Sequence, residues 1–126
     1  MHTIVDKKTL MAFMKEMKKT SPRKVLIYIY SPHCFHCTIF NDTWLEFVTT
    51  SHDALKTSDV LAVKMEYSDA LFRSIEKESP AMLHAIRRMM TKQAGVPNIA
   101  KWFPTSDRVV MFTKERTLPQ VRSFAK

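Results

Sequence analysis

The chain has 126 residues, of which 45% are hydrophobic and 25% are charged, and we expect residues 1–126 to form one globular domain. Its single glycine excludes a collagen-like chain, and its apolar content is too high for a disordered one. The net charge of +8 and the isoelectric point near 9.7 leave two classes of partner to consider, nucleic acids and acidic proteins.

No stretch of the sequence has the length of a membrane-spanning helix. The longest apolar run, from Val25 to Tyr30, is far shorter than the ~20 residues that such a helix needs. Asp6, Lys7 and Lys8 interrupt the apolar residues near the N-terminus, which is atypical of a secretory signal. We therefore expect a soluble cytoplasmic protein, although a mature chain whose signal has been removed would have the same sequence.

Hydrophobic periodicity predicts that helices and strands alternate along the whole chain. A helix is expected from Lys7, capped by Asp6 and ended by Ser21 and Pro22. The run over 24–30 is apolar on both faces, which is typical of a strand at the centre of a sheet that is covered on both sides. The remaining expected elements are a helix over 38–48, a polar connection over 49–58 that can include a helical turn, a strand over 60–67, helices from 68 or 69 to 78 and over 80–92, strands over 98–103 and 108–113, and a helix over 117–125.

The order of these elements predicts an α/β fold. A buried strand that feeds a helix and then another strand favours a right-handed crossover with parallel pairing. The short strands over 98–103 and 108–113 are joined by a polar turn, which favours an antiparallel hairpin. We therefore expect a layered sandwich in which a mixed central sheet is flanked by helices.

Several large apolar side chains are expected in the core. The helix over 38–48 has a predicted buried stripe that consists of Phe40, Trp44, Leu45 and Val48. Trp102 is expected in the core as well. Methionines that recur at helical spacing are interpreted as core filler rather than as a metal-binding or client surface, and these are Met11, Met14, Met17, Met89 and Met90.

The only cysteines, Cys34 and Cys37, directly follow the predicted central strand. A Cys-x-x-Cys segment that opens a helix places its first sulfur at the helix N-terminus, where free amides favour a thiolate. The second sulfur lies one turn further and can attack a mixed disulfide formed by the first. This spacing predicts Cys34 as the nucleophile and Cys37 as the resolving thiol. His36, and less directly His33, would add a hydrogen-bond donor or a positive charge beside the thiolate.

The segment from Val25 to Cys37 resembles the active-site strand and motif of the thioredoxin family, and Val96-Pro97 resembles its cis-proline loop. The element order resembles the family over nearly the whole chain. The resemblance implies a thioredoxin-like three-layer sandwich in which Pro97 is cis and the Val96 backbone pairs with an extended client peptide. It also implies that Lys64 is the strand lysine beneath the active site, and Phe35 is expected to contact clients.

The chain departs from the family pattern at several positions. Phe35-His36 stands between the cysteines where thioredoxins have Gly-Pro, and His33 replaces their tryptophan. The buried acid that assists the resolving cysteine in thioredoxins falls on Tyr28, with Glu66 as a nearby candidate. The segment before Val96 is longer and predicts an extra helix over 80–92. Lys114-Glu115-Arg116 replaces the glycine-containing loop before the last helix.

The Cys-x-His-Cys motif resembles oxidising and isomerase members of the family more than reductases. The resemblance implies a thiol–disulfide oxidoreductase that acts on protein disulfides or dithiols, with Cys34, Cys37 and His36 as catalytic residues. No cofactor and no metal are expected. We expect a reduction potential above the roughly −270 mV of thioredoxin and nearer the roughly −180 mV of protein disulfide isomerase.

The residues also leave other interpretations open. The cysteines could be a structural pair or part of a zinc site, and a four-ligand site with His33 and His36 would be strained because the ligands are so close in sequence. The chain could be a redox-inactive thioredoxin-like module that holds a protein partner with its basic surface or its inserted helix. Nucleic-acid binding is not favoured, because the basic residues occur without interleaved aromatic residues or a recognised motif.

Overall fold

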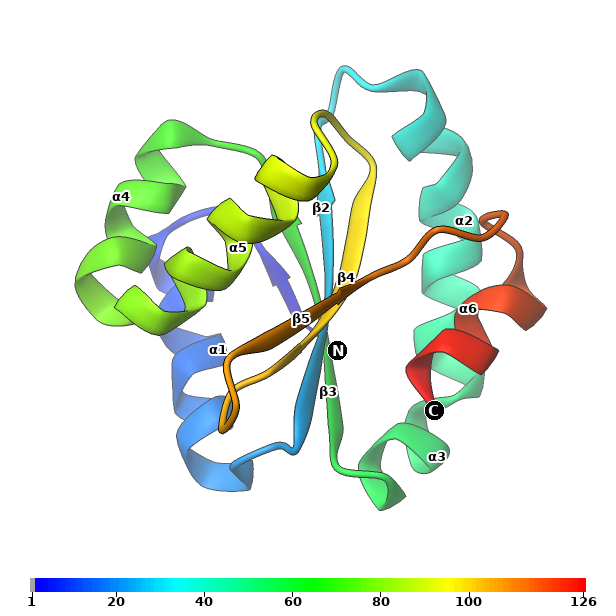
Figure 1. Cartoon of the computed structure of the whole chain (residues 1–126), viewed down its shortest axis with the longest axis horizontal. Helices are drawn as coiled ribbons and strands as arrows, with labels where there is room; N and C mark the ends of the chain where they lie inside the picture. The colour runs from blue at the N-terminus through cyan, green and yellow to red at the C-terminus, as the bar shows by residue number, and fades with distance from the viewer. Residues whose placement is uncertain (1) are drawn as a thin grey trace.

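The computed structural model describes residues 2–126 and shows a five-stranded sheet between two layers of helices (Figure 1). The order of the strands across the sheet is β1-β3-β2-β4-β5. β1 and β2 pair in parallel with β3, whereas β4 is antiparallel to both β2 and β5, so the expected mixed sheet is confirmed. The strands are β1 (His2–Ile4), β2 (Lys24–Tyr30), β3 (Val60–Glu66), β4 (Asn98–Phe103) and β5 (Arg108–Met111).

Helices cover both faces of the sheet, as the three-layer expectation requires. One face carries α1 (Lys7–Thr20), α4 (Asp69–Glu78) and α5 (Pro80–Lys92), and the other carries α2 (Phe35–Thr50), α3 (His52–Thr57) and α6 (Leu118–Ala125) (Figure 1). The pair α4 and α5 includes the predicted extra helix before Val96-Pro97. Among residues 2–126, no helix combines the length and the apolar character needed to cross a membrane.

β2 lies at the centre of the sheet and is buried from Lys24 to Ile29. Its side chains alternate between the two faces because successive residues of a strand point in opposite directions. Val25, Ile27 and Ile29 belong to the core under α1, α4 and α5, which also contains Trp102. Leu26 and Tyr28 belong to the core under α2 and α6, which also contains Trp44. Each buried aliphatic side chain contributes about 1.5–3 kcal/mol to folding.

Polar caps define where the helices on the first face begin. The Asp6 carboxylate accepts the Thr9 N–H at 2.9 Å, and the Thr9 hydroxyl accepts the Asp6 N–H at 3.1 Å, which forms a capping box. The Ser68 hydroxyl accepts the Leu71 N–H at the start of α4. Ser79 does the same for Met82 at the start of α5, where Pro80 takes the first helical position.

Some predicted boundaries are wrong. β1 was not expected, and α2 begins at Phe35 rather than at residue 38. The helical turn that the sequence allowed within the polar connection is α3. β3 ends at Glu66 and β5 at Met111, so both strands are shorter than their predicted ranges.

Two residues predicted for the core lie at the surface. Leu45 is 52% exposed and Met11 is 42% exposed. Phe47, which is 1% exposed, faces the core on α2 in place of Leu45. The other predicted core residues are buried or packed against the core: Phe40, Trp44, Val48, Met89 and Trp102 are buried, and Met14, Met17 and Met90 are half-buried.

Candidate active site

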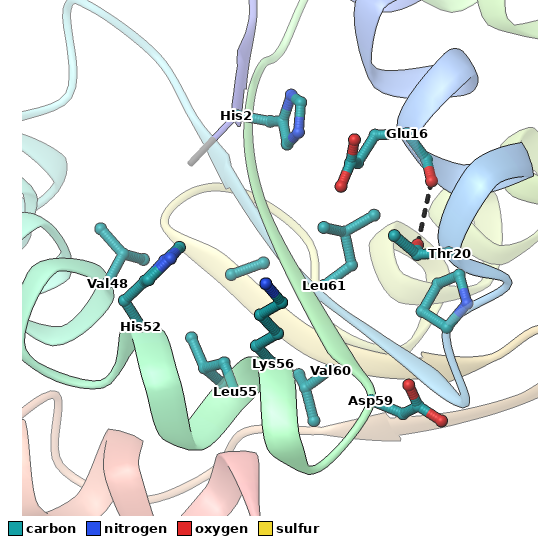
Figure 2. Close-up of a pocket in the computed structure, with 12 residues that line it drawn as sticks. His2, Glu16, Thr20, Val48, His52, Leu55, Lys56, Asp59, Val60 and Leu61 are labelled. Atoms are coloured by element: carbon teal, nitrogen blue, oxygen red, sulfur yellow. Dashed lines mark hydrogen bonds between the residues drawn. The ribbon is translucent and has the colours of Figure 1, made fainter.

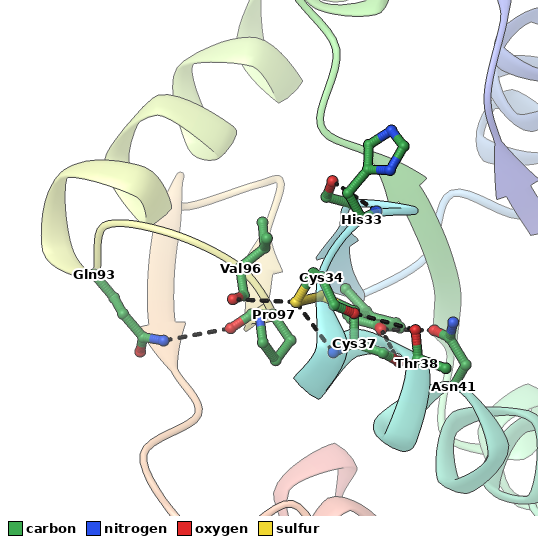
Figure 3. The surroundings of a disulfide bond; sticks show 10 residues. His33, Cys34, Cys37, Thr38, Asn41, Gln93, Val96 and Pro97 are labelled. Carbon is green, nitrogen blue, oxygen red and sulfur yellow. Dashed lines mark hydrogen bonds between the residues drawn. A yellow bond between two sulfur atoms is a disulfide. The ribbon is translucent and has the colours of Figure 1, made fainter.

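Cys34 and Cys37 form a disulfide at the point where β2 gives way to α2 (Figure 3). After β2 the chain turns, and the Cys34 N–H donates to the Ser31 carbonyl at 3.2 Å. Cys34 is the N-cap of α2, and its Sγ accepts the Cys37 N–H at 3.1 Å. The two Cα atoms are 5.1 Å apart. The disulfide therefore spans the first turn of α2.

The two sulfurs differ in their access to solvent. Cys37 is fully buried, whereas Cys34 is half-buried. The free amides and the dipole at a helix N-terminus stabilise negative charge, and the sulfur of the N-cap residue lies closest to them. The arrangement thus places a sulfur that an external disulfide can reach at the position where a thiolate is favoured, with a second, shielded sulfur beside it.

The loop before β4 packs against this disulfide (Figure 3). The Val96–Pro97 peptide bond is cis, and Cys34 Sγ lies 3.6 Å from the Val96 carbonyl oxygen. Gly95 has a φ of 85°, a conformation that residues with a side chain rarely adopt. Gln93 Nε2 donates to the Pro97 carbonyl at 3.5 Å. The fold therefore brings together two segments that lie about half the chain apart.

A buried tyrosine is bonded to the backbone of Cys37. The Tyr28 hydroxyl donates to Asn41 Oδ1 at 2.7 Å and lies 3.3 Å from the Cys37 carbonyl oxygen. Burial raises the pKa of Tyr28 well above its ordinary value, so the hydroxyl stays protonated at neutral pH. Asn41 was not predicted as a site residue. Its position one helical turn beyond Cys37, on the same side of α2, is the signal that could have identified it.

Lys64 lies beside Tyr28 on β3 and faces the same layer. Its Nζ is 4.5 Å from the ring centroid of Tyr30 and 5.9 Å from that of Tyr28, within the range of cation–π attraction. Burial lowers the pKa of Lys64. Burial raises the pKa of Tyr30, and the negative charge of Glu66 adds to this shift. Glu66 therefore acts on Tyr30, whereas Tyr28 is the residue bonded to Cys37.

The other residues of the motif lie at the surface. Phe35 is 73% exposed, and its ring centroid lies 5.7 Å from that of exposed His36. The ring of His33 points away from the disulfide (Figure 3). Within residues 2–126, the polar contacts of Cys34 Sγ are with the Cys37 N–H and the Val96 carbonyl oxygen. The structure thus places the His36 ring against Phe35, outside the hydrogen bonds of Cys34.

Two cavities lie elsewhere in the fold. One of about 450 Å³ is lined by residues of α1, α3 and β3, including Glu16, His52 and Lys56 (Figure 2). The other, of about 510 Å³, lies between α4 and α5 and is lined by Phe72 and Arg87 among others. Neither is lined by the cysteines. Across residues 2–126, no group of three or more His, Cys, Asp or Glu side chains could hold a metal ion.

No family model matches the sequence, and no curated protein matches it. Solved structures match the fold. The first thioredoxin domain of mouse protein disulfide-isomerase A4 aligns with a TM-score of 0.58 and 16% identity, covering 98% of this chain and 74% of that one. The J-Trx1 fragment of ERdj5 aligns with a TM-score of 0.58 and 17% identity, covering 98% of this chain and 49% of that one.

The first two thioredoxin domains of Saccharomyces cerevisiae Eps1p align with a TM-score of 0.60 and 19% identity, covering 89% of this chain and 37% of that one. The chain thus spans about half or less of the ERdj5 and Eps1p structures. At these identities the likeness concerns the arrangement of helices and strands. The mixed sheet, its two helical layers and these alignments together show that the chain has the fold of the thioredoxin-like superfamily.

Proposed function

We propose that the chain is a thiol–disulfide oxidoreductase that acts on protein disulfides or dithiols. The observation that supports this most directly is the Cys34–Cys37 disulfide across the first turn of α2, with one sulfur accessible and the other buried. A disulfide that serves stability alone requires neither a helix N-terminus nor an accessible sulfur. Both features favour a thiolate that can attack a partner.

The proposed reduction of a client proceeds in two exchanges. The Cys34 thiolate attacks one sulfur of the client disulfide, and the other client sulfur leaves with the electron pair. The Cys37 thiolate then attacks Cys34 Sγ, which forms the Cys34–Cys37 bond and releases the second client sulfur as a thiolate. The client is reduced by two electrons and the enzyme is oxidised by two. The reverse sequence oxidises a client dithiol.

We assign client contacts to the surface around Cys34. An extended peptide that presents its sulfur to Cys34 must pass the Val96-Pro97 loop, because the Val96 carbonyl lies 3.6 Å from that sulfur. Exposed Phe35 offers an apolar contact, and Ile39, 58% exposed, extends it one turn along the same side of α2. We assign Lys64 a supporting role, because its ammonium group contacts the rings of Tyr28 and Tyr30 through cation–π attraction.

A trapping experiment tests the proposed function. Cys37→Ser should accumulate mixed disulfides between Cys34 and clients, visible as bands that disappear on reduction in a gel. Cys34→Ser is the matched control and should form none. Wild-type protein should also accelerate the reduction of insulin by dithiothreitol, and Cys34→Ser should not. If Cys37→Ser traps no mixed disulfide and the wild type does not accelerate insulin reduction, the proposal is contradicted and the redox-inactive binding module is favoured.

The role proposed for His36 is tested separately. In this disulfide form the His36 ring packs against Phe35 rather than against Cys34, so the proposal requires it to turn toward the Cys34 thiolate once the disulfide is reduced, where a donor would favour the reduced form. A redox titration against glutathione should therefore give a potential above the roughly −270 mV of thioredoxin, and His36→Ala should lower it. A wild-type value at or below that of thioredoxin would remove His36 from the mechanism without affecting the assignment of Cys34 and Cys37.

A further inference from the structure

If the chain acts as proposed above, the buried Cys37 thiol must be deprotonated before the second exchange can occur. Cys37 is fully buried, and a thiol must lose its proton before it can attack a disulfide. A buried thiol resists ionisation because charge is costly away from water. A base beside the sulfur would reduce the free-energy cost of ionising the thiol by accepting its proton. The groups around Cys37 therefore determine how the thiol is deprotonated.

Within the described residues 2–126, no carboxylate is hydrogen-bonded to Cys37, Tyr28 or Asn41. On β2, the protonated Tyr28 hydroxyl donates to Asn41 and points at the Cys37 carbonyl. The positive charge of Arg116, in the loop before α6, acts on Tyr28. Other titratable groups on these elements are Tyr30 at the end of β2, Lys64 and Glu66 on β3, and exposed His36 on α2 itself.

Packing holds the Tyr28 ring in place. Its centroid lies 4.9 Å from that of Phe40 in an edge-to-face contact and 5.2 Å from that of Trp44. The ring is also fully buried. Because the ring is buried and packed against Phe40 and Trp44, the hydroxyl keeps its position against the first turn of α2, and its hydrogen bond ties that turn to β2.

We propose that Cys37 resolves mixed disulfides without a carboxylate base, and that Tyr28 is a positioning residue which holds the first turn of α2 around the buried sulfur. The Cys37 proton passes to hydroxide from the solvent. The Cys37 thiolate then attacks Cys34 Sγ, the bond from Cys34 to the client breaks, and the client sulfur leaves with the electron pair. The rate follows the thiolate fraction, so it rises about tenfold per pH unit below the ionisation of the thiol. Mixed disulfides are therefore long-lived in acid and are resolved rapidly in alkali.

The reaction of reduced protein with one equivalent of 5,5′-dithiobis(2-nitrobenzoate) separates the two exchanges. Attack by Cys34 releases a first nitrothiobenzoate, and displacement by Cys37 releases a second. Cys37→Ser should release only the first. The first phase tests the proposed function, because Cys34→Ser would abolish it. The pH dependence of the second phase tests the inference.

The second phase should accelerate about 100-fold from about pH 6 to about pH 8 in the wild type. Tyr28→Phe should keep this slope but be slower at every pH, because the first turn of α2 is no longer held. Tyr67→Phe, which removes the hydroxyl of an exposed ring that packs against Phe72 in the other helical layer, should match the wild type. A wild-type rate that is independent of pH would overturn the proposal. So would a Tyr28→Phe variant with an altered slope, or one with an unchanged rate.

Two further variants keep the inference testable if Tyr28→Phe does not fold. Asn41→Leu removes the acceptor of the Tyr28 hydrogen bond while leaving Tyr28 in place. This variant should slow the second phase at every pH and keep the wild-type slope, and an unchanged rate or an altered slope would count against the inference. His36→Ala should retain the wild-type slope, because a lost slope would identify the imidazole as the base.

Discussion

Asp6 shows at the scale of one residue how hydrogen bonds fix the start of a helix. Its carboxylate accepts the backbone N–H and the hydroxyl of Thr9, at 2.9 Å and 2.8 Å. These bonds, the backbone one foremost, lower the pKa of Asp6 from its ordinary value of 3.8. The ionised carboxylate is therefore stabilised in the folded protein relative to the unfolded chain.

The stability that Asp6 contributes should depend on pH. Because the folded-state pKa lies below 3.8, the contribution is complete above that value and is lost as the pH falls through the folded pKa. Asparagine caps a helix without ionising. The melting temperature of Asp6→Asn should therefore fall less than that of the wild type when the pH is lowered from about 7 to about 3. Circular dichroism measures the melting temperatures of the wild type and of Asp6→Asn at each pH, and an equal loss in the two proteins would contradict the prediction.

The residues of the candidate site differ in how far the sequence could identify them. The approach of Val96-Pro97 to Cys34 was implied by the resemblance, in which the cysteine motif follows the central strand and the proline precedes a neighbouring strand. The bond between Tyr28 and Asn41 was not predicted, since it depends on where α2 docks along β2. The ring of His36 packs against Phe35, a side-chain choice that sequence spacing does not determine.

On the scale of single elements, α2 shows why a buried face can be assigned wrongly. Trp44 and Leu45 are adjacent, so both fit an apolar stripe, but the angle at which the helix packs decides which one is covered. α2 turns Phe40, Trp44, Phe47 and Val48 toward β2 and α6. Leu45 is left on the outer side of the helix.

A pair of alanine substitutions on α2 tests this orientation. Phe47→Ala removes a fully packed ring and should lower the free energy of unfolding by about 3–5 kcal/mol. Leu45→Ala should change it by less than about 0.5 kcal/mol, because the side chain is largely in water. Urea denaturation of both variants measures the difference. Equal losses would mean that Leu45 contributes to the core.

The elements themselves were predictable where local signals mark them. Ser68, Ser79 and Pro80 indicate the starts of α4 and α5, and both helices occur where the sequence places them. β1 consists of three residues, which are too few for the alternation of apolar and polar residues in a strand to be recognised. Its strand conformation comes from pairing with Val63, Lys64 and Met65 of β3, which lie about sixty residues away.

The molecule as a whole has a net positive charge. Its ion pairs offset only a small part of the repulsion between its like charges. Arg87 pairs with Glu76 at 3.3 Å, and Arg88 and His84 approach Asp107 at 3.5 Å and 3.7 Å. The Arg87–Glu76 pair is largely exposed, Arg88 and Asp107 are partly exposed, and His84 forms an ion pair only when protonated, so each contributes at most about 1 kcal/mol. With a net charge of +8, repulsion between like charges opposes the compact fold.

Salt should therefore stabilise the protein. Raising sodium chloride from about 0.01 M to about 0.5 M shortens the screening length from ~30 Å to below ~10 Å and weakens this repulsion. The urea midpoint should rise. A double variant, Lys7→Gln with Lys8→Gln, lowers the net charge and should show a smaller rise. A midpoint that falls with salt would indicate that the attractive pairs outweigh the repulsion.

The two tryptophans lie on opposite faces of the sheet. Trp44 is buried beneath α2 beside Tyr28, and Trp102 is buried in the other core, where its Nε1 donates to Asp107 at 3.3 Å. Each helical layer therefore has its own indole fluorophore. Replacing either one with phenylalanine leaves a single emitter, so the emission of Trp44 and that of Trp102 can follow the unfolding of each layer separately.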